Sequence, residues 1–141
     1  MPDCIFCKII EDKLPAQKVY ENKDLVAFLD IHPINPGHTL VVPKEHCKNL
    51  LDMPERMIEK TFVAAKKIAH AVKKGTNAEG INVGMNNDPA SGQVVFHAHI
   101  HIIPRYNNDG LKLWPGKPYQ DGQAREIQKR ILAELPKEIF C

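Results

Sequence analysis

The sequence has 141 residues, of which 43% are hydrophobic and 26% are charged, as is typical of one soluble globular domain. The formal net charge of +2 and the lack of a long lysine and arginine run argue against nucleic acid as the main partner, because nucleic-acid-binding proteins concentrate basic charge. No apolar stretch approaches the roughly 20 residues that cross a bilayer, and the first residues do not resemble a secretory signal, so we expect a cytoplasmic protein without a membrane partner.

The first part of the chain predicts one short helix and three strands. Residues 4–13 place apolar side chains at helical spacing, and Pro15 ends this helix. Two short strands, 19–20 and 25–29, are joined by a hairpin-like loop, and a third strand covers 38–42.

The clearest predicted helix begins near Asp52 and Pro54 and ends at Gly75, where we expect a left-handed cap. Two more strands are expected at 81–85 and 94–103. One face of the long helix is predicted to carry an apolar stripe made of Ile58, Phe62, Ala65, Ala69 and Val72.

The order of these elements predicts an α+β fold. Neighbouring strands with short loops indicate a five-stranded, mainly antiparallel sheet, covered on one face by the long helix. After Pro104 the pattern becomes irregular, with a possible last helix over 124–135. We expect a single domain over residues 1–141, with a core at about 4–106 and a tail at 107–141.

Three histidines alternate along the last predicted strand. Because alternate side chains of a strand point to the same face, His97, His99 and His101 are expected to share one face. The outer two would stand roughly 13 Å apart at about 3.3 Å per residue, whereas zinc-bound nitrogens lie only ~2 Å from the metal. At least one of the three must therefore do something other than bind a shared metal. The opposite, core face of the strand is expected to hold Phe96, Ala98, Ile100 and Ile102.

Nucleophilic catalysis at phosphorus suits such a strand better than a shared metal does. A neutral imidazole is a good nucleophile at pH 7, since its reference pKa is about 6.5. Its attack on a phosphoryl group gives a phosphorus–nitrogen bond that water can cleave in a second step. A neighbouring imidazole can donate to the phosphate oxygens and to the leaving group.

The motif His97-Ala98-His99-Ile100-His101-Ile102-Ile103 resembles the His-φ-His-φ-His-φ-φ signature of the histidine triad superfamily, φ being apolar. The resemblance covers about residues 4–106 and is to the nucleotide-binding, Hint-like and bacterial-type branch, in which some members contain zinc. Four further segments match in the same order, namely residues 4–10, 28–31, 36–44 and 92–93.

The resemblance implies a role for each matching position. His99 would be the nucleophile that takes up the nucleotidyl group, His101 would contact the phosphate and the leaving group, and His38 would support the triad. Three polar residues would bind the nucleotide: Asp30 at the ribose hydroxyls, and Asn86 and Gln93 around the phosphate. The base pocket would be walled by Ile5, Phe6, Ile9, Phe28, Ile31 and Leu40.

Some of these positions have simpler explanations. Asp30 and Asn86 could be turn residues, and Phe28 and Leu40 would be core residues in almost any fold. One position departs from the nucleoside phosphoramidase branch of the family, which has a serine directly after the glutamine. Val94 stands there in this sequence, which puts one phosphate contact in doubt.

The pair Cys4-x-x-Cys7 fits either a metal site or a redox pair, and free thiols are the plain alternative. A thioredoxin-like pair follows a strand, and no strand is predicted before residue 4. The zinc-bearing members of the superfamily imply His46 and His97 as the other two ligands, in a closed, structural, tetrahedral site. Cys47 stands beside His46 and could replace it. His97 would then serve the metal as well as the triad.

The sequence and the resemblance together predict a hydrolase. It would cleave purine nucleoside 5′-phosphoramidates or related nucleotide derivatives through a nucleotidyl-histidine intermediate. The alternatives are a dinucleoside polyphosphate hydrolase and a nucleotide-binding regulator with little catalysis. We expect structural zinc, no organic cofactor, a purine nucleotide ligand of the AMP or GMP type and, by family analogy, a homodimer.

Overall fold

The computed structural model describes residues 3–139 and divides the chain into two units, residues 1–109 and 110–141. The second unit contains helix α3 (Gln123–Glu134), close to the predicted last helix. The division lies near the predicted end of the core. That all 141 residues form one domain stays a prediction. None of the described helices is long and apolar enough to cross a membrane.

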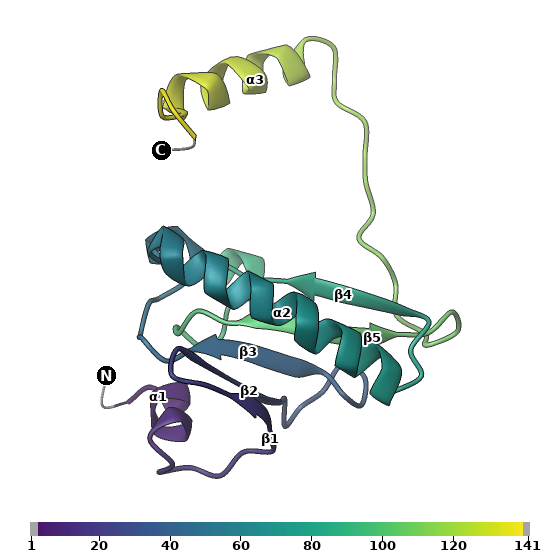
Figure 1. The fold of residues 1–141 in the computed structure, drawn as a ribbon. Coiled ribbons are helices and arrows are strands. Elements are labelled where there is room, and N and C mark those ends of the chain that lie inside the picture. The colour runs from purple at the N-terminus through teal and green to yellow at the C-terminus, as the bar shows by residue number, and fades with distance from the viewer. Residues whose placement is uncertain (1–2, 140–141) are drawn as a thin grey trace. The chain divides into compact units, whose positions relative to one another are not determined.

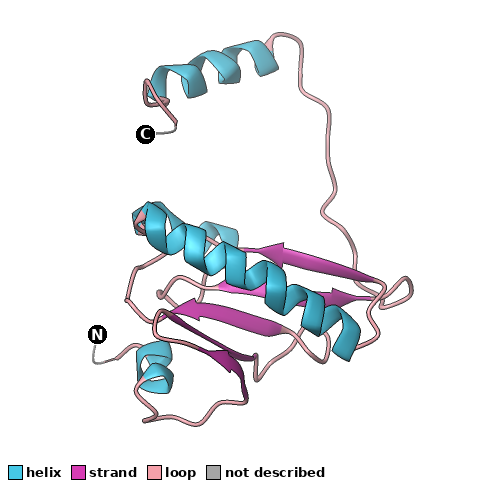
Figure 2. Cartoon of the chain, viewed as in Figure 1, coloured by secondary structure: helices cyan, strands magenta, loops and turns pink. Residues whose placement is uncertain are grey.

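The first unit is a five-stranded antiparallel sheet with two helices, which confirms the predicted α+β fold (Figures 1 and 2). The strand order is β1-β2-β3-β5-β4, and the long helix α2 lies across one face of the sheet. The elements are α1 (Ile5–Ile10), β1 (Lys18–Glu21), β2 (Leu25–Leu29), β3 (Thr39–Pro43), α2 (Glu55–Gly75), β4 (Gly80–Gly84) and β5 (Ile100–Arg105), with 3-10 turns at Leu50–Asp52 and Pro89–Ser91.

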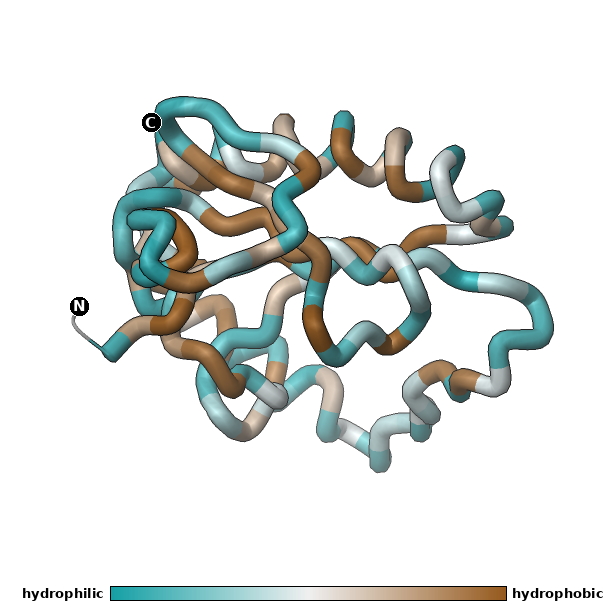
Figure 3. Tube along the Cα trace, turned by 90° about the horizontal axis from the view of Figure 1, so that it is seen from below, coloured by the Kyte–Doolittle hydropathy of each residue, from teal (hydrophilic) through white to brown (hydrophobic). Residues whose placement is uncertain are grey.

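Strands β2 and β3 are buried on both faces, which explains their continuous apolar sequences. Alternate residues point to opposite faces, so Leu25 and Val41 pack with α2, while Phe28 and Leu40 pack with α1. Figure 3 shows brown, hydrophobic stretches that alternate with teal, hydrophilic stretches along the chain. The α1 face matters for function because His101 lies opposite Leu40 in the ladder and therefore on the same face.

The last strand begins later than predicted. β5 starts at Ile100, so residues 94–99 precede the strand and the predicted strand start at residue 94 is wrong. Phe96 is 43% exposed instead of lying in the core, whereas Ala98, Ile100 and Ile102 are buried as expected. Other bonds hold this segment: the backbone N–H of Ala98 donates to the Cys47 carbonyl at 2.7 Å, outside the ladder.

Helix α2 ends differently from the prediction. Gly75 is its last helical residue, and the left-handed conformation falls at Asn77, with φ of 55°. The N–H of Ala78 donates to the Lys73 carbonyl at 3.0 Å, which is the bond of a Schellman motif with asparagine in the position glycine usually takes. The predicted apolar stripe is also shifted: Phe62 is 39% exposed, and Thr61 takes a buried place instead.

Candidate functional site

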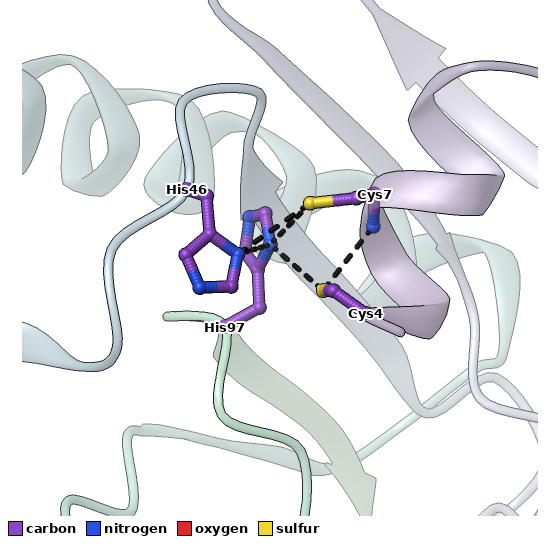
Figure 4. A group of neighbouring side chains, drawn as sticks. All are labelled: Cys4, Cys7, His46 and His97. Atoms are coloured by element: carbon purple, nitrogen blue, oxygen red, sulfur yellow. Dashed lines mark hydrogen bonds between the residues drawn. The ribbon is translucent and has the colours of Figure 1, made fainter. Parts of the chain in front are cut away.

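Two cysteines and two histidines from three separate segments converge beside α1 (Figure 4). Cys4 caps the start of α1, where its Sγ accepts the backbone N–H of Cys7 at 3.4 Å. His46 follows β3, and His97 precedes β5. The four ligand atoms all lie within 4.8 Å of one another.

The spacing of these four atoms fits a tetrahedral zinc ion. Bond lengths of about 2.3 Å to sulfur and about 2.0 Å to nitrogen imply edges of about 3.6 Å from S to N and about 3.3 Å from N to N. The His97 Nδ1 atom lies 3.3 Å from Cys4 Sγ and 3.5 Å from Cys7 Sγ. Its distance to His46 Nδ1 is 3.1 Å, and Cys7 Sγ lies 3.4 Å from the same His46 atom. The donor set of two sulfurs and two nitrogens is one that zinc prefers.

The second ring nitrogen of His97 fixes the orientation of the ring. Its Nε2–H donates to the Pro43 carbonyl at 2.7 Å, which leaves the Nδ1 lone pair to face the cysteines. Burial lowers the pKa of His97 to about 4, so the ring is neutral at pH 7, as a metal ligand must be. Burial and the neighbouring Cys4 raise the pKa of the Cys7 thiol. Cys47 lies outside the group and packs against Met53 and Ala98, so His46 is the better ligand.

A second histidine cluster lies on the same face of the sheet and forms a chain of hydrogen bonds. His38 Nδ1 accepts the backbone N–H of Ile34 at 3.1 Å, so the neutral ring carries its proton on Nε2. That Nε2–H donates to His101 Nδ1 at 2.9 Å. His101 must then carry its own proton on Nε2, which makes Nε2 a hydrogen-bond donor.

His99 has the opposite arrangement of its ring nitrogens. Its Nδ1–H donates to the His97 carbonyl at 2.6 Å, so its Nε2 atom holds a lone pair. The ring is 8% exposed, and its centroid lies 4.8 Å from that of His101. A basic nitrogen on His99 therefore stands beside a donating ring on His101.

Burial keeps these imidazoles neutral at pH 7. It lowers the pKa of His101 to about 4, with further lowering from His99 and His38. Burial also lowers the pKa of His99, against the opposing effect of its bond to the His97 carbonyl. It lowers the pKa of His38 as well, although the charge of Asp30 opposes this. A neutral His99 is the form that can act as a nucleophile.

The residues predicted to wall the base pocket divide into four buried and two exposed side chains. Phe6, Ile9, Phe28 and Leu40 form one buried cluster, whereas Ile5 is 46% and Ile31 83% exposed. The Phe6 ring meets Phe28 edge-on at 5.4 Å and His99 at 5.0 Å between centroids. The cluster therefore joins α1 directly to the triad.

Asp30 lies at the end of β2, close to the second cluster. Its Oδ1 accepts the backbone N–H of His32 at 2.9 Å, as in a turn, and its Oδ2 lies 3.8 Å from His38 Nε2. The turn bond and a binding role are compatible, because a carboxylate has further lone pairs.

Gln93 and Asn86, the two residues predicted to contact the phosphate, have different surroundings. Gln93 is 5% exposed, and its amide nitrogen donates to the carbonyls of Lys48 and Val95 at 2.7 and 3.1 Å. Its Oε1 accepts from the backbone of Asp88 at 2.8 Å. Because both amide protons are used, Gln93 holds the loops around the site and has no donor left for a phosphate. Asn86 is half-buried and lies next to Gly92.

Asn49 is a site residue that the sequence did not reveal. It is 3% exposed and donates from Nδ2 to Gln93 Oε1 at 3.2 Å and to Asp88 Oδ1 at 3.1 Å. Its Oδ1 accepts the N–H of Leu51 at 3.1 Å, so it also caps the turn at Leu50–Asp52. Only the spacing of Asn49 and Asp52, which form a capping box, could have indicated it.

Arg105 follows the triad and is the last residue of β5. Its guanidinium donates to Asp109 at 2.7 Å and to Asn82 at 2.8 Å. These contacts tie the end of the strand to its neighbours.

A groove of about 840 Å³ between α2 and strands β1 and β2 contains none of the histidines, so groove volume alone does not locate the candidate site.

Comparisons with known proteins show the family and the fold of this chain. The family model "HIT domain" matches residues 11–108, and the chain belongs to the HIT family. A crystal structure of a HIT family member from Bacillus subtilis is 38% identical, with a TM-score of 0.88 over 96% of this chain and 99% of that one.

Two further relatives carry informative names. A Zn-bound histidine triad protein from Mycobacterium smegmatis is 34% identical, with a TM-score of 0.75 over 94% of this chain and 99% of that one. The Arabidopsis thaliana protein named Adenylylsulfatase HINT3 is 36% identical over 96% of this chain and 73% of its own length.

Proposed function

We propose that this protein is a nucleotidyl hydrolase that cleaves purine nucleoside 5′-phosphoramidates or related nucleotide derivatives. The observation that carries the proposal is the pairing of ring nitrogens. His99 offers a basic Nε2, and His101 beside it offers an Nε2–H donor. One ring can attack while its neighbour donates, and this is what stepwise displacement at phosphorus requires.

The chemistry proceeds in two balanced steps. The His99 Nε2 lone pair forms a bond to phosphorus while the bond from phosphorus to the amine breaks, and the amine takes one proton from the solvent as it leaves. The Nε2–H of His101 hydrogen-bonds to the departing atom and to the phosphate oxygens. Water then attacks phosphorus and breaks its bond to His99 Nε2, which releases the nucleoside monophosphate and neutral His99, and the proton lost by the water goes to the solvent and replaces the one the amine took.

The surroundings of the triad support a nucleotide as the substrate. The exposed side chains of Ile5 and Ile31, which are next in sequence to the buried Phe6 and to Asp30, offer a purine an apolar surface. Asp30 Oδ2 remains available for ribose hydroxyl groups, and we assign the phosphate contacts to Asn86 and the triad. The relative named as an adenylylsulfatase supports chemistry at the phosphorus of an adenylyl group in this family.

Substitution of the proposed nucleophile tests the function. His99→Ala should lower kcat by at least ~10³-fold on an adenosine phosphoramidate, because the covalent route is lost, while AMP binding stays within a few-fold. His32→Ala, an exposed histidine outside the bonded chain, is the matched control and should keep full activity. Single-turnover cleavage retained in His99→Ala would overturn the proposal.

The choice of leaving group is tested separately. Turnover of an adenosine phosphoramidate should exceed turnover of a diadenosine polyphosphate under identical conditions. The reverse ratio would favour the dinucleoside polyphosphate hydrolase. Binding of AMP without turnover of either substrate would favour the nucleotide-binding regulator.

We also propose that Cys4, Cys7, His46 and His97 hold a structural zinc ion. The fit of the four ligand atoms to tetrahedral edges and the bond from His97 Nε2 to Pro43 support this assignment. Such an ion would link α1 to the loop after β3 and to the segment before β5. Native mass spectrometry should find one zinc per chain, and Cys7→Ala should lose it while Cys47→Ala keeps it.

A homodimer is proposed on the exposed edge of the sheet. β4 is an edge strand, and its Val83 is 45% exposed near the exposed Phe62 of α2. Both side chains line a groove of about 450 Å³ between α2 and β4. Unpaired edge strands with apolar side chains invite pairing with a second copy. Val83→Lys should shift the sedimentation coefficient from dimer to monomer, and an unchanged dimer would contradict this interface.

A further inference from the structure

We propose that Asp88 positions the side chain of Asn86 for the phosphate group of the nucleotide, through a strained backbone conformation that the carboxylate of Asp88 itself holds. The inference rests on the proposed function, in which Asn86 contacts the phosphate. It makes Asp88 a positioning residue, which acts through Asn86 and does not touch the substrate. Both residues lie in the loop between β4 and β5.

The backbone of Asp88 has a conformation that residues with a side chain rarely adopt. Its φ is 70° and its ψ is 157°. Positive φ with an extended ψ is a region that glycine occupies almost alone, because a Cβ atom is crowded there by the backbone. Such strain persists only where the surrounding bonds hold the residue, and it is concentrated at functional sites. The bonds of Asp88 should therefore account for its conformation.

Four groups bind Asp88 and fix the rotation of its backbone. Its carboxylate Oδ1 accepts from Asn49 Nδ2 at 3.1 Å and lies 3.0 Å from Lys48 Nζ. Its backbone N–H donates to Gln93 Oε1 at 2.8 Å, and its carbonyl accepts the N–H of Ser91 at 3.1 Å. The side chain and the N–H stand on the two atoms of the N–Cα bond, so bonds to both of them fix φ. Lys48 lowers the pKa of the Asp88 carboxyl, which is therefore ionised at neutral pH.

The residues next to Asn86 are anchored, whereas the Asn86 side chain is not. Asn87 Oδ1 accepts the backbone N–H of Leu50 at 2.8 Å, so Asn87 and Asp88 are both bound to the segment between β3 and α2. The half-buried side chain of Asn86 makes no hydrogen bond to any residue that the structure describes. Its amide is therefore available to a ligand, as an oxygen acceptor and as an N–H donor.

The conformation of Asp88 also decides where Asn86 meets the returning chain. Asp88 and Gly92, with φ values of 70° and 98°, stand on either side of the 3-10 turn Pro89–Ser91. These two reversals bring Gly92 back beside Asn86, so that a Cβ atom on Gly92 would lie only 3.6 Å from Asn86 Nδ2. The Asn86 amide thus packs against a residue without a side chain. A different φ at Asp88 would move this contact and the amide with it.

Substitution by glycine separates the conformation from the bonds that hold it. Glycine adopts a positive φ without strain, so Asp88→Gly should fold. Its backbone is not held in that conformation, because the bonds from Asn49 and Lys48 to the carboxylate are gone. We expect the loop to sample other conformations and the Asn86 amide to lose its fixed position.

A double-mutant cycle tests whether Asp88 acts through Asn86. Asn86→Ala and Asp88→Gly should each lower kcat/KM on an adenosine phosphoramidate by about 10–100-fold, the scale of a hydrogen bond to a charged group. The double variant should lose no more than Asn86→Ala alone, because the amide that Asp88 positions is already absent. Losses that multiply in the double variant would overturn the inference, since they would mean that Asp88 acts independently of Asn86.

Ligand binding gives a second readout that does not require turnover. Affinity for AMP should fall by about tenfold in Asp88→Gly, whereas affinity for adenosine, which has no phosphate, should stay within about twofold of wild type. Titrations followed by NMR measure both ligands on the same protein. An equal loss of affinity for AMP and adenosine would contradict a role in positioning a phosphate contact.

Two control variants use the same kind of residue. Asp12 also has a positive φ, of 58°, and its carboxylate pairs with Lys18 in the turn after α1. Asp12→Gly should keep kcat/KM within about twofold of wild type. Asp88→Asn retains an oxygen that can accept from Asn49, so it should keep kcat/KM within about threefold.

A milder variant keeps the test available if Asp88→Gly does not fold. Lys48→Ala removes one partner of the Asp88 carboxylate, and it should lower kcat/KM by about threefold in wild type and not at all in the Asn86→Ala background. The same loss in both backgrounds would overturn the inference.

Failure of this inference can be told apart from failure of the proposed function. Wild-type protein that binds AMP and cleaves no phosphoramidate contradicts the function, and the AMP and adenosine titrations still test Asp88. An active wild-type protein whose Asp88→Gly variant keeps its AMP affinity and its kcat/KM contradicts only the positioning role.

Discussion

The two histidine clusters of this protein are built from the same side chain and differ in which ring nitrogen meets a backbone carbonyl. His97 gives Nε2–H to Pro43, which leaves Nδ1 for the cysteines. His99 gives Nδ1–H to His97, which leaves Nε2 as the basic atom. One residue along the segment separates the proposed metal ligand from the proposed nucleophile, and the position of the carbonyl acceptor distinguishes the two rings.

We expect the group of Cys4, Cys7, His46 and His97 to contribute more to the free energy of unfolding than the second histidine cluster does. His97→Ala removes a fully buried ring, leaves the Pro43 carbonyl without its donor and removes one ligand, at a cost of about 3–5 kcal/mol in the free energy of unfolding. The melting temperature should fall by more than about 10 °C. His32→Ala is the exposed control and should melt within a degree or two of wild type. A His97→Ala protein as stable as wild type would contradict the claim that this group of residues stabilises the fold.

The other cluster should dominate rate. His38→Phe removes the Nε2–H that fixes the proton of His101, so the donating nitrogen of His101 is no longer defined. We expect kcat to fall by roughly 10–100-fold while the zinc content stays at one per chain. Steady-state kinetics with metal analysis on the same sample checks both. Loss of zinc in this variant would show that the two clusters are not separable.

A fall in pH should lower the free energy of unfolding, because the buried histidines of the second cluster are neutral in the folded protein and take up protons more readily in the unfolded chain. Burial lowers the pKa of His101 to about 4, so the unfolded chain, with a pKa near 6.5, binds more protons between these values. The stabilisation is complete above pH 6.5 and is lost as the pH falls toward 4. Chemical denaturation at several pH values measures this slope, and His101→Gln should reduce it. An identical slope in His101→Gln would mean that other groups cause the loss.

The smallest expected effect concerns the departure from the phosphoramidase branch. Val94 is 84% exposed, so Val94→Ser should change the free energy of unfolding by less than about 0.5 kcal/mol. A hydroxyl at this position should raise kcat/KM on a phosphoramidate by a few-fold if it reaches the phosphate. A drop in kcat/KM would show that the exposed valine itself contributes to substrate binding.

The sequence predicted the fold because strands and helices leave a periodic pattern, whereas the site residues were predicted from the resemblance to the histidine triad superfamily. The apolar runs of β2 and β3, the long helix and the quartet of Cys4, Cys7, His46 and His97 lie where they were expected. The late start of β5 was missed because the alternation of residues 96–102 continues past the point where pairing ends.

The acceptors that set the tautomers were beyond any sequence argument. The carbonyls of Pro43 and His97 are backbone atoms, and every residue has one, so no residue type marks them. Gln93 was assigned to the phosphate because the resemblance implied it, yet both of its amide protons are donated to the carbonyls of Lys48 and Val95. Whether a buried amide is free depends on contacts between distant segments, and the sequence does not show them.

Intact-protein mass spectrometry of a rapidly quenched reaction tests the central claim most directly. Zinc-loaded wild-type protein mixed with an adenosine phosphoramidate should gain the mass of one adenylyl group, located on His99 by peptide mapping, and should lose it as AMP appears. His99→Ala should gain nothing. Substrate turnover by wild-type protein with no adduct at any time, or an adduct on a residue other than His99, would contradict the account.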